Sequence, residues 1–182
     1  MQIRKAVKAD IPAVAAIYAD THTEIEAGRL SVGWIRSIYP GVHTAEAAVE
    51  RDDLFVAEVD GEIVGTAIIN HRQEEMYAGA PWEFEAPEDK VMVLHTLVIS
   101  PKHFGKGYGP LFVKFYEDYA LNHGCPYLRM DTNAINLRAQ AMYAKLGYQA
   151  IAVVPCDFNG IPGIRLVLLE KRLSKNHIAG LP

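Results

Sequence analysis

Apolar residues recur with two different periods along this chain of 182 residues. Short apolar or alternating runs bounded by turn residues predict β-strands, and apolar residues spaced three and four apart predict helices. The runs that predict strands lie at residues 3–7, 54–59, 62–69, 91–99, 127–131, 148–154 and 164–169. The stripes that predict helices begin after Asp10 and lie within 24–49 around a break at Pro40-Gly41, at 111–119 and at 137–146.

Turn residues connect several of these elements directly. Asp60-Gly61 separates two strand patterns by two residues, which is a strong hairpin signal. Residues 159–163 are rich in glycine and are expected to join the last two strands as an antiparallel pair. A hairpin near each end of the chain, with helices mixed among the strands, indicates an α/β or α+β domain built on a mixed sheet.

Two neighbouring segments depart from simple alternation. The run 91–99 is almost continuously apolar, with only His95 and Thr96 polar, and this is typical of a strand that is buried on both faces. Residues 71–90 show neither period and are rich in aromatic, acidic and small residues. Loops of this length in compact domains are often functional, so we expect a surface excursion that contributes to a site.

Composition narrows the class of protein. Half of the residues are hydrophobic and 22% are charged, which fits one folded domain over residues 1–173 followed by a tail at 174–182. The net charge of -4 disfavours nucleic-acid binding, and no apolar run reaches the roughly 18 residues of a membrane span. There is no signal-peptide core. Two isolated cysteines and seven histidines without ligand spacing predict a reduced, cytoplasmic protein with no metal site.

The run Phe104-Gly105-Lys106-Gly107-Tyr108-Gly109 follows the buried strand and precedes a helical stripe. A glycine turn at a helix N-terminus exposes backbone N–H groups and binds anions; Lys106 adds a charge, and Pro110 suits the first helical turn. A P-loop requires Ser or Thr after its lysine, but Gly107 stands there. A dinucleotide fingerprint requires a last glycine where this chain has Pro110 or Phe112. A merely tight turn is the remaining alternative.

This loop resembles the acyl-CoA loop of the GNAT N-acyltransferases, whose pattern is Gln or Arg, two residues, Gly, one residue, and Gly or Ala. Gly107 and Gly109 occupy the two glycine places, and Phe104 stands where the family has Gln or Arg. Residues 136–148 resemble the second signature, an Asn before a helix carrying Ala and Tyr and a closing Lys-x-Gly-aromatic. The resemblance extends over residues 1–172 and implies a mixed, mostly antiparallel central sheet of about six to seven strands flanked by helices.

The resemblance implies acetyl-CoA as the acyl donor. In the family the pantetheine arm lies along the strand before the glycine loop, with an N–H near Leu97 or Val98 polarising the acyl carbonyl. Tyr143 matches the tyrosine whose hydroxyl meets the coenzyme sulfur, and a phenol remains a proton donor at neutral pH. Asn136 is expected to cap the helix or to bind the arm, with Asn133 as the rival cap. The residues expected to bind the coenzyme are Leu97, Val98, Ile99, Phe104, Gly105, Lys106, Gly107, Tyr108, Gly109, Pro110, Asn136 and Tyr143.

The amine acceptor must lose a proton before it attacks, because its pKa lies near about 10.4. His95 precedes Leu97 by two residues on the buried strand, so regular alternation would put both side chains on one face. Histidine titrates near about 6.5, which makes His95 the predicted base alongside Tyr143 as the second catalytic residue. Asp131 and the acids Glu83 and Glu85 are the rivals for this role.

The acceptor is expected between the first helices and the 71–90 excursion. The residues predicted to bind it are Tyr18, Trp34, Tyr77, Trp82 and Asp131. The sequence thus predicts an N-acetyltransferase that moves an acetyl group from acetyl-CoA to a primary amine of a small molecule or peptide by direct attack in a ternary complex. A non-catalytic acyl-CoA sensor of the same fold is the alternative, and a homodimer stays open.

Overall fold

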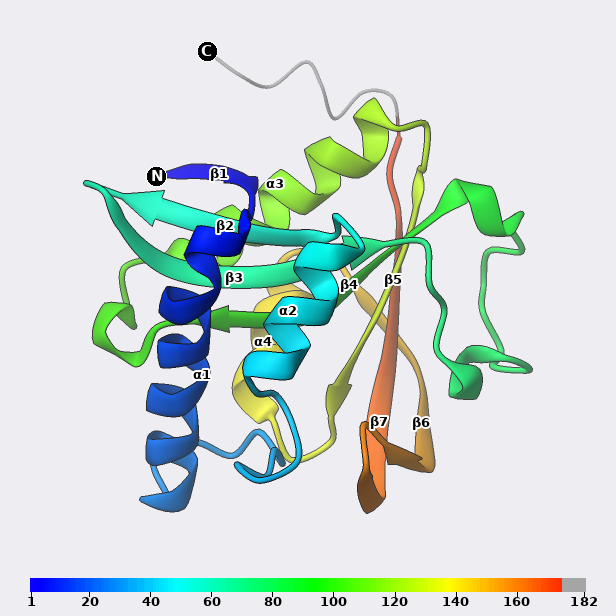
Figure 1. Cartoon of the computed structure of the whole chain (residues 1–182). Helices are drawn as coiled ribbons and strands as arrows, with labels where there is room; N and C mark the ends of the chain where they lie inside the picture. The colour runs from blue at the N-terminus through cyan, green and yellow to red at the C-terminus, as the bar shows by residue number, and fades with distance from the viewer. Residues whose placement is uncertain (175–182) are drawn as a thin grey trace.

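The apolar runs form seven strands of one sheet in the order β1-β2-β3-β4-β5-β7-β6 (Figure 1). The structure is a computed structural model that describes residues 1–174, so the predicted tail, apart from Ser174, lies outside the described residues. The strands are β1 (Gln2–Lys5), β2 (Leu54–Val59), β3 (Glu62–Asn70), β4 (Val91–Ile99), β5 (Tyr127–Asn133), β6 (Gln149–Phe158) and β7 (Ile161–Arg172). Only β4 and β5 pair in parallel, which confirms the mixed, mostly antiparallel sheet.

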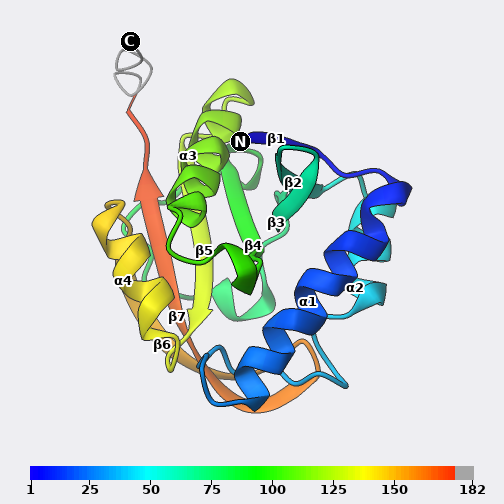
Figure 2. The same ribbon diagram turned by 90° about the vertical axis from the view of Figure 1, so that its left-hand side faces the viewer.

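Helices cover both faces of this sheet, as the turned view shows (Figure 2). One face carries α1 and α2, whose core joins Val14 and Ala45 to Val56 of β2. The other face carries α3 and α4, which pack Phe112 and Tyr143 against the sheet. The helix bounds are α1 (Ile11–Glu26), α2 (Val42–Glu50), α3 (Tyr108–Asn122) and α4 (Leu137–Lys145), and the 3-10 turns are η1 (Lys8–Asp10), η2 (Glu75–Tyr77), η3 (Glu88–Lys90) and η4 (Pro101–His103).

The second predicted helical region is wrong for residues 27–41. Helix α1 ends at Glu26, and the chain then runs without helix to α2, apart from an isolated bridge. Gly33 has a φ of 84° here, and a Cβ at this position would lie 2.2 Å from the Nδ2 atom of Asn133. The α1–α2 connection thus passes against the end of β5 in a backbone conformation that is not helical, and it holds Trp34 over the sheet.

Strand β4 is buried on both faces, as its apolar run predicts. Met92 and Leu94 belong to the core beneath α3, whereas Val91 and Val93 pack with Tyr77 of the excursion on the opposite face. The two 3-10 turns η2 and η3 are the regular structure within residues 71–90. The excursion is therefore mostly exposed, and Tyr77, Met76 and Trp82 anchor it against the sheet.

The strands β4 and β5 separate halfway along their length. Their parallel pairing covers only Val91 to Leu94 against Tyr127 to Met130. Beyond this point β4 stays paired with β3, while β5 continues beside β7. Residues 95–99 consequently present one backbone edge that no strand of the described chain covers. No helix among residues 1–174 is long and apolar enough to cross a membrane.

Candidate functional site

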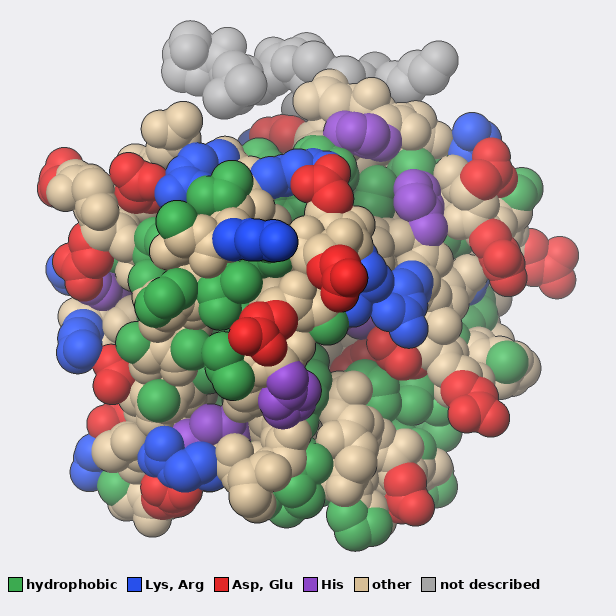
Figure 3. Space-filling model, viewed as in Figure 1, with side chains coloured by type: hydrophobic (Ala, Val, Ile, Leu, Met, Phe, Trp, Pro, Cys, Tyr) green, Lys and Arg blue, Asp and Glu red, His purple; other side chains and the backbone are tan. Residues whose placement is uncertain are grey.

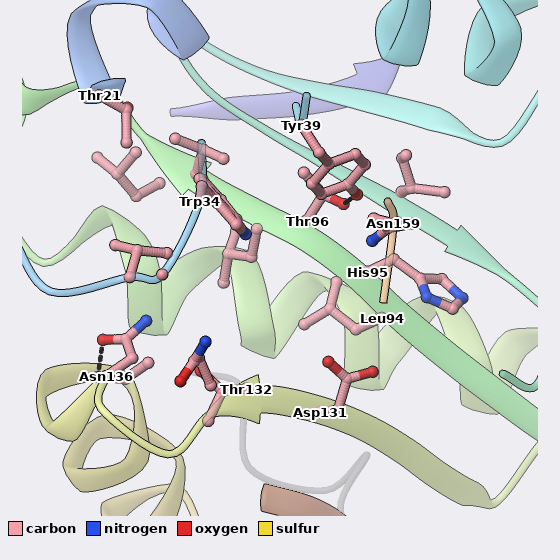
Figure 4. Close-up of a pocket in the computed structure, with 18 of the residues that line it drawn as sticks. Thr21, Trp34, Tyr39, Leu94, His95, Thr96, Asp131, Thr132, Asn136 and Asn159 are labelled. Carbon is pink, nitrogen blue, oxygen red and sulfur yellow. Dashed lines mark hydrogen bonds between the residues drawn. The ribbon is translucent and has the colours of Figure 1, made fainter. Parts of the chain in front are cut away.

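A cavity of about 820 Å³ opens where β4 and β5 part. It extends from the glycine loop and α4, past the uncovered edge of β4, to the α1–α2 connection and the tip of the β6–β7 hairpin at Phe158 and Asn159. Figure 4 shows Trp34 and Tyr39 entering it from above and Asp131 from below. Acidic and basic side chains are interspersed over the face in Figure 3, without one broad basic stripe. The cavity thus joins segments that are far apart in the sequence.

The glycine loop forms one end of the cavity. Gly105 and Gly107 have φ values of 80° and 79°, and a Cβ on either would meet no atom within 4 Å. The left-handed backbone, rather than lack of space, is therefore what requires glycine at both positions. Gly107 is the N-cap of α3, so the loop ends at the positive end of that helix dipole. This arrangement suits a phosphate group.

Phe104, which stands where the family has Gln or Arg, contacts an arginine from helix α4. The guanidinium of Arg138, in the first turn of α4, lies 4.3 Å from the centroid of the Phe104 ring. Both residues line the cavity, whereas the Lys106 side chain is exposed and does not. The cation beside the loop therefore comes from α4, and the predicted role of Lys106 lacks support from the lining.

Three predicted coenzyme residues of β4, Leu97 to Ile99, line the middle of the cavity. Asn136 lies opposite them and caps α4, since its Oδ1 accepts a hydrogen bond of 3.2 Å from the Ala139 N–H (Figure 4). Asn133 instead accepts from the N–H of Ile135, so the cap prediction for Asn136 is confirmed. The Nδ2 group of Asn136 makes no hydrogen bond among residues 1–174 and is free to donate into the cavity.

Tyr143 lies on the α4 side of the same space. Its side chain is 6% exposed and lines the cavity, and its hydroxyl bonds to no other described residue. Burial, helped by the nearby Asp131 carboxyl, raises the pKa of Tyr143 well above its ordinary value of about 10. The phenol therefore stays protonated at neutral pH and can serve as a hydrogen-bond or proton donor.

Asp131 lies on the other side of the fork, half-buried in the wall of the cavity. The Tyr77 hydroxyl donates a 2.8 Å hydrogen bond to its Oδ2 atom. Burial raises the pKa of Asp131 to about 7; the Tyr77 hydrogen bond opposes this shift, and the neighbouring Glu74 carboxyl adds to it. A carboxyl group that titrates near neutrality, next to a cavity, is a candidate acid or base.

His95 is held by two oxygen atoms. Its Nε2 lies 3.1 Å from Oδ1 of Asn70, and its Nδ1 lies 3.3 Å from Oε1 of Glu74. Asn70 is fixed in this orientation, since its Nδ2 donates to Asp53 and its Oδ1 accepts from the Arg72 N–H. Burial lowers the pKa of His95 to about 4.

The prediction that His95 and Leu97 share a face is wrong. A bulge lies between them, because Ile68 of β3 pairs with His95 and Thr66 with Val98, which leaves one extra residue on β4. Thr96 adopts a φ of 51° in this bulge, and its hydroxyl is hydrogen-bonded to Tyr39. Leu97 therefore packs toward the α3 core, while His95 contacts Asn70 and Glu74.

Of the residues predicted to bind the acceptor, Trp34 and Asp131 line the cavity. Tyr18 is instead buried between α1 and the sheet, while Tyr77 supports Asp131 from behind and Trp82 packs between Tyr77 and the Arg129 guanidinium. The rival acids Glu83 and Glu85 are absent from the lining as well. Among the polar lining residues that sequence reasoning missed are Tyr39, Asn70, Glu74 and Thr96, and of these only Thr96 had a signal, as a polar residue in an apolar run. Residues 1–174 contain no group of three His, Cys, Asp or Glu side chains arranged to hold a metal ion.

Known proteins share this architecture. The model of the acetyltransferase (GNAT) family matches residues 15–148. A GNAT-family acetyltransferase from Streptococcus agalactiae is 25% identical with a TM-score of 0.79, covering 96% of each chain. The putative acetyltransferase yncA from Salmonella typhimurium, solved with its cofactor acetyl-CoA, is 20% identical with a TM-score of 0.68 over 96% of this chain and 95% of that one. A ribosomal-protein-alanine N-acetyltransferase from Brucella melitensis is 20% identical with a TM-score of 0.69 over 95% and 100%. No curated protein matches the sequence.

Proposed function

Because the chain belongs to the acetyltransferase (GNAT) family, we propose that it transfers the acetyl group of acetyl-CoA to a primary amine by direct attack in a ternary complex. The observation that carries this proposal is the continuity of the cavity, which joins a glycine loop suited to anions to a half-buried polar cluster of Asn70, Glu74, His95 and Asp131. Direct transfer requires both substrates in one space, since the amine nitrogen must reach the acyl carbon. The family membership and the yncA complex support acetyl-CoA as the donor.

The donor half would be held mainly by backbone groups. The N–H groups of the glycine loop and the first turn of α3 suit the pyrophosphate, and Arg138 adds a cation. The uncovered edge of β4 at residues 97–99 offers hydrogen-bond partners to the amide groups of the pantetheine arm. An N–H of this edge would polarise the acyl carbonyl, since a fixed donor in an enclosed site stabilises charge developing on oxygen.

Tyr143 is suited to the leaving group. When bound, acetyl-CoA supplies an activated thioester, whose sulfur must gain a proton as the C–S bond breaks. The buried hydroxyl of Tyr143 is protonated, faces the cavity and has no competing partner among the described residues. A general acid of this kind contributes on the order of 10²–10⁴ in rate.

The acceptor half favours an amine on a small body or at a peptide end. The aromatic and apolar part of the lining is Trp34, Tyr39, Phe158 and Leu166. Its acidic residues are Glu74 and Asp131. The similar structure from Brucella melitensis is named a ribosomal-protein-alanine N-acetyltransferase, so peptides belong beside small amines among the candidates. The identity of the acceptor is the part of the proposal that needs an unbiased screen.

The test measures thiol release from acetyl-CoA in the presence of a panel of 2-phenylethylamine, spermidine, amino acids and an alanine-terminated peptide. Amine-dependent thiol release, with the acetylated amine identified by mass spectrometry, is the expected result. Binding of acetyl-CoA without turnover of any amine would favour the sensor alternative. Absence of acetyl-CoA binding in a thermal-shift titration would overturn the proposal, since a ligand bound by the native state raises Tm.

A further inference from the structure

The position of Asp131 follows from the fork in the sheet. The last parallel pair of β4 and β5 is Leu94 with Met130, so Asp131 is the first residue of β5 without a partner on β4. Met130 points into the α3 core, and the alternate side chain of Asp131 points to the opposite face, where Tyr77 meets it. In Figure 4 its carboxyl group points from β5 toward β4, into the cavity.

Only one of the two carboxyl oxygens is occupied. Tyr77 donates to Oδ2, whereas Oδ1 accepts no hydrogen bond from any residue in 1–174. A carboxylate has room for several donors, so the open oxygen can accept a hydrogen bond from a ligand in the cavity. An ammonium group is the complementary ligand, because it brings both a charge and three donors.

His95 is less suited to receive the acceptor's proton. One ring nitrogen donates to Asn70 in the neutral tautomer, and the other faces Glu74, so neither nitrogen is directed at an open ligand position. Burial also keeps the imidazole neutral, since its pKa is lowered to about 4. Asp131, with one open oxygen, has the geometry that His95 lacks.

We propose that Asp131 binds the acceptor as an ammonium ion and takes the proton that frees its nitrogen for attack, with Tyr77 as the positioning residue. This inference rests on the proposed acetyltransferase function and names the substrate class: primary amines that are protonated at neutral pH. In the first step an N–H bond breaks and an O–H bond forms on Asp131. As the C–N bond forms and the C–S bond breaks, the Tyr143 hydroxyl gives its proton to the sulfur. The second proton of the nitrogen passes to the Tyr143 oxygen and restores the hydroxyl. Asp131 then returns its proton to water when the product leaves.

Magnitudes favour this carboxyl group over an exposed one. An alkyl ammonium has a pKa of about 10.4 and an ordinary aspartate one of about 3.9, so transfer to an exposed aspartate is very unfavourable. Burial raises the pKa of Asp131 to about 7 and removes about three units of that difference. The fraction of neutral amine formed by transfer therefore rises roughly a thousandfold.

Several groups face Asp131 and set the sign of each test. They come from the excursion, the α1–α2 connection, α4 and β6, and are Glu74, Tyr77, Tyr39, Tyr143 and Cys156. The Tyr77 hydrogen bond stabilises the charged carboxylate, so its loss raises the pKa of Asp131. The Glu74 carboxylate repels that charge, so its removal lowers the pKa of Asp131.

The experiment combines a direct titration with a rate profile. The carboxyl carbon of Asp131, labelled with 13C-aspartate and assigned with Asp131→Asn, is titrated by NMR in the protein without ligands. The acidic limb of kcat/KM is then measured with the best amine of the panel. We expect both midpoints near pH 7. Tyr77→Phe should move both upward by roughly one unit, the worth of a hydrogen bond to a charged group, and Glu74→Gln should move both downward. Asp131→Asn should abolish the limb.

Two controls separate a positioning role from a structural one. Tyr116→Phe removes a buried phenol hydroxyl that donates to the Met92 carbonyl and does not contact Asp131. The variant loses one buried hydrogen bond, as Tyr77→Phe does, but the pH midpoint should stay in place. His95→Gln should also leave the midpoint in place, whatever happens to kcat. If Tyr77→Phe fails to fold, Glu74→Gln still decides. If the enzyme turns over but the pH midpoint of its acidic limb shifts in His95→Gln, the inference is overturned. It is also overturned if this midpoint shifts in neither Tyr77→Phe nor Glu74→Gln. In both cases the acetyltransferase proposal stays intact.

Discussion

Replacing Arg138 by alanine tests whether α4, rather than Lys106 of the glycine loop, supplies the cation at this end of the cavity. Arg138 is the second residue of α4, at the positive end of the helix dipole, where a cation is unfavourable by about 0.3–1 kcal/mol. No carboxylate of residues 1–174 pairs with it, and its guanidinium rests on the Phe104 ring at 4.3 Å. A cation placed there at a cost to the helix, with no anion of residues 1–174 beside it, is suited to bind an anionic ligand.

The expected magnitude follows from the kind of bond and its exposure. A hydrogen bond to a charged group contributes about 1.5–3 kcal/mol, and the exposed side chain of Arg138 reduces this toward about 1–2 kcal/mol. The Kd for acetyl-CoA should therefore rise roughly 5- to 30-fold in Arg138→Ala. Arg138→Lys should recover only part of the loss, since lysine keeps the charge but loses the stacked planar group.

Isothermal titration calorimetry at two ionic strengths measures this effect. Lys145→Ala is the matched control, because it removes the same charge from the exposed C-terminal end of α4, about 10 Å away along the helix axis. Ionic screening acts over about that distance, so its effect should be small. Equal losses in the two variants, or an unchanged Kd in Arg138→Ala, would refute the reasoning. Dephospho-CoA then distinguishes a contact to the 3'-phosphate from one to the pyrophosphate.

Two further variants test the cavity from the loop and from the leaving-group side. Tyr143→Phe should lower kcat by about 10²-fold or more with the Kd for acetyl-CoA nearly unchanged, and a parallel loss of both in stopped-flow binding and turnover assays would assign Tyr143 to structure instead. Gly107→Ala forces a left-handed residue at a φ of 79°, at a cost of roughly 1–2 kcal/mol in stability, and should weaken acetyl-CoA binding as well. Gly124→Ala, at a φ of 70° beyond the other end of α3, should show a similar drop in Tm but bind acetyl-CoA normally.

Local signals in the sequence predicted the donor half of the site. Gly105 and Gly107 have a left-handed backbone, whereas Gly109 lies within α3 without a positive φ, and Asn136 caps α4 as expected. These features depend on residues close together in the chain, so one turn and one cap suffice to predict them. The strands are predictable for the same reason. The almost continuous apolar run of β4, for example, predicts its burial on both faces.

The acceptor half depends on contacts between distant segments. Glu74 meets His95 because the excursion folds back on β4, and Tyr39 reaches Thr96 across 57 positions of the chain. Nor does the sequence reveal the bulge, since a β-branched residue such as Thr96 seldom adopts positive φ. The helix expected over residues 27–41 fails in the same way, because Gly33 lies close to the distant residue Asn133 with a positive φ.

The bulge at Thr96 explains how one strand serves both halves of the cavity. Without it, side chains on the acceptor face of β4 would alternate strictly, and Leu97 would point at the polar cluster instead of the α3 core. The extra residue lets His95 contact Glu74 and Thr96 contact Tyr39, and turns Leu97 and Ile99 back toward the donor side. A positive φ at a threonine costs about 1–3 kcal/mol, and such strain persists only where surrounding contacts over-determine it. The hydrogen bond to Tyr39 and the β3 register on either side provide those contacts, so the strained residue is held at the point where the donor and acceptor halves meet.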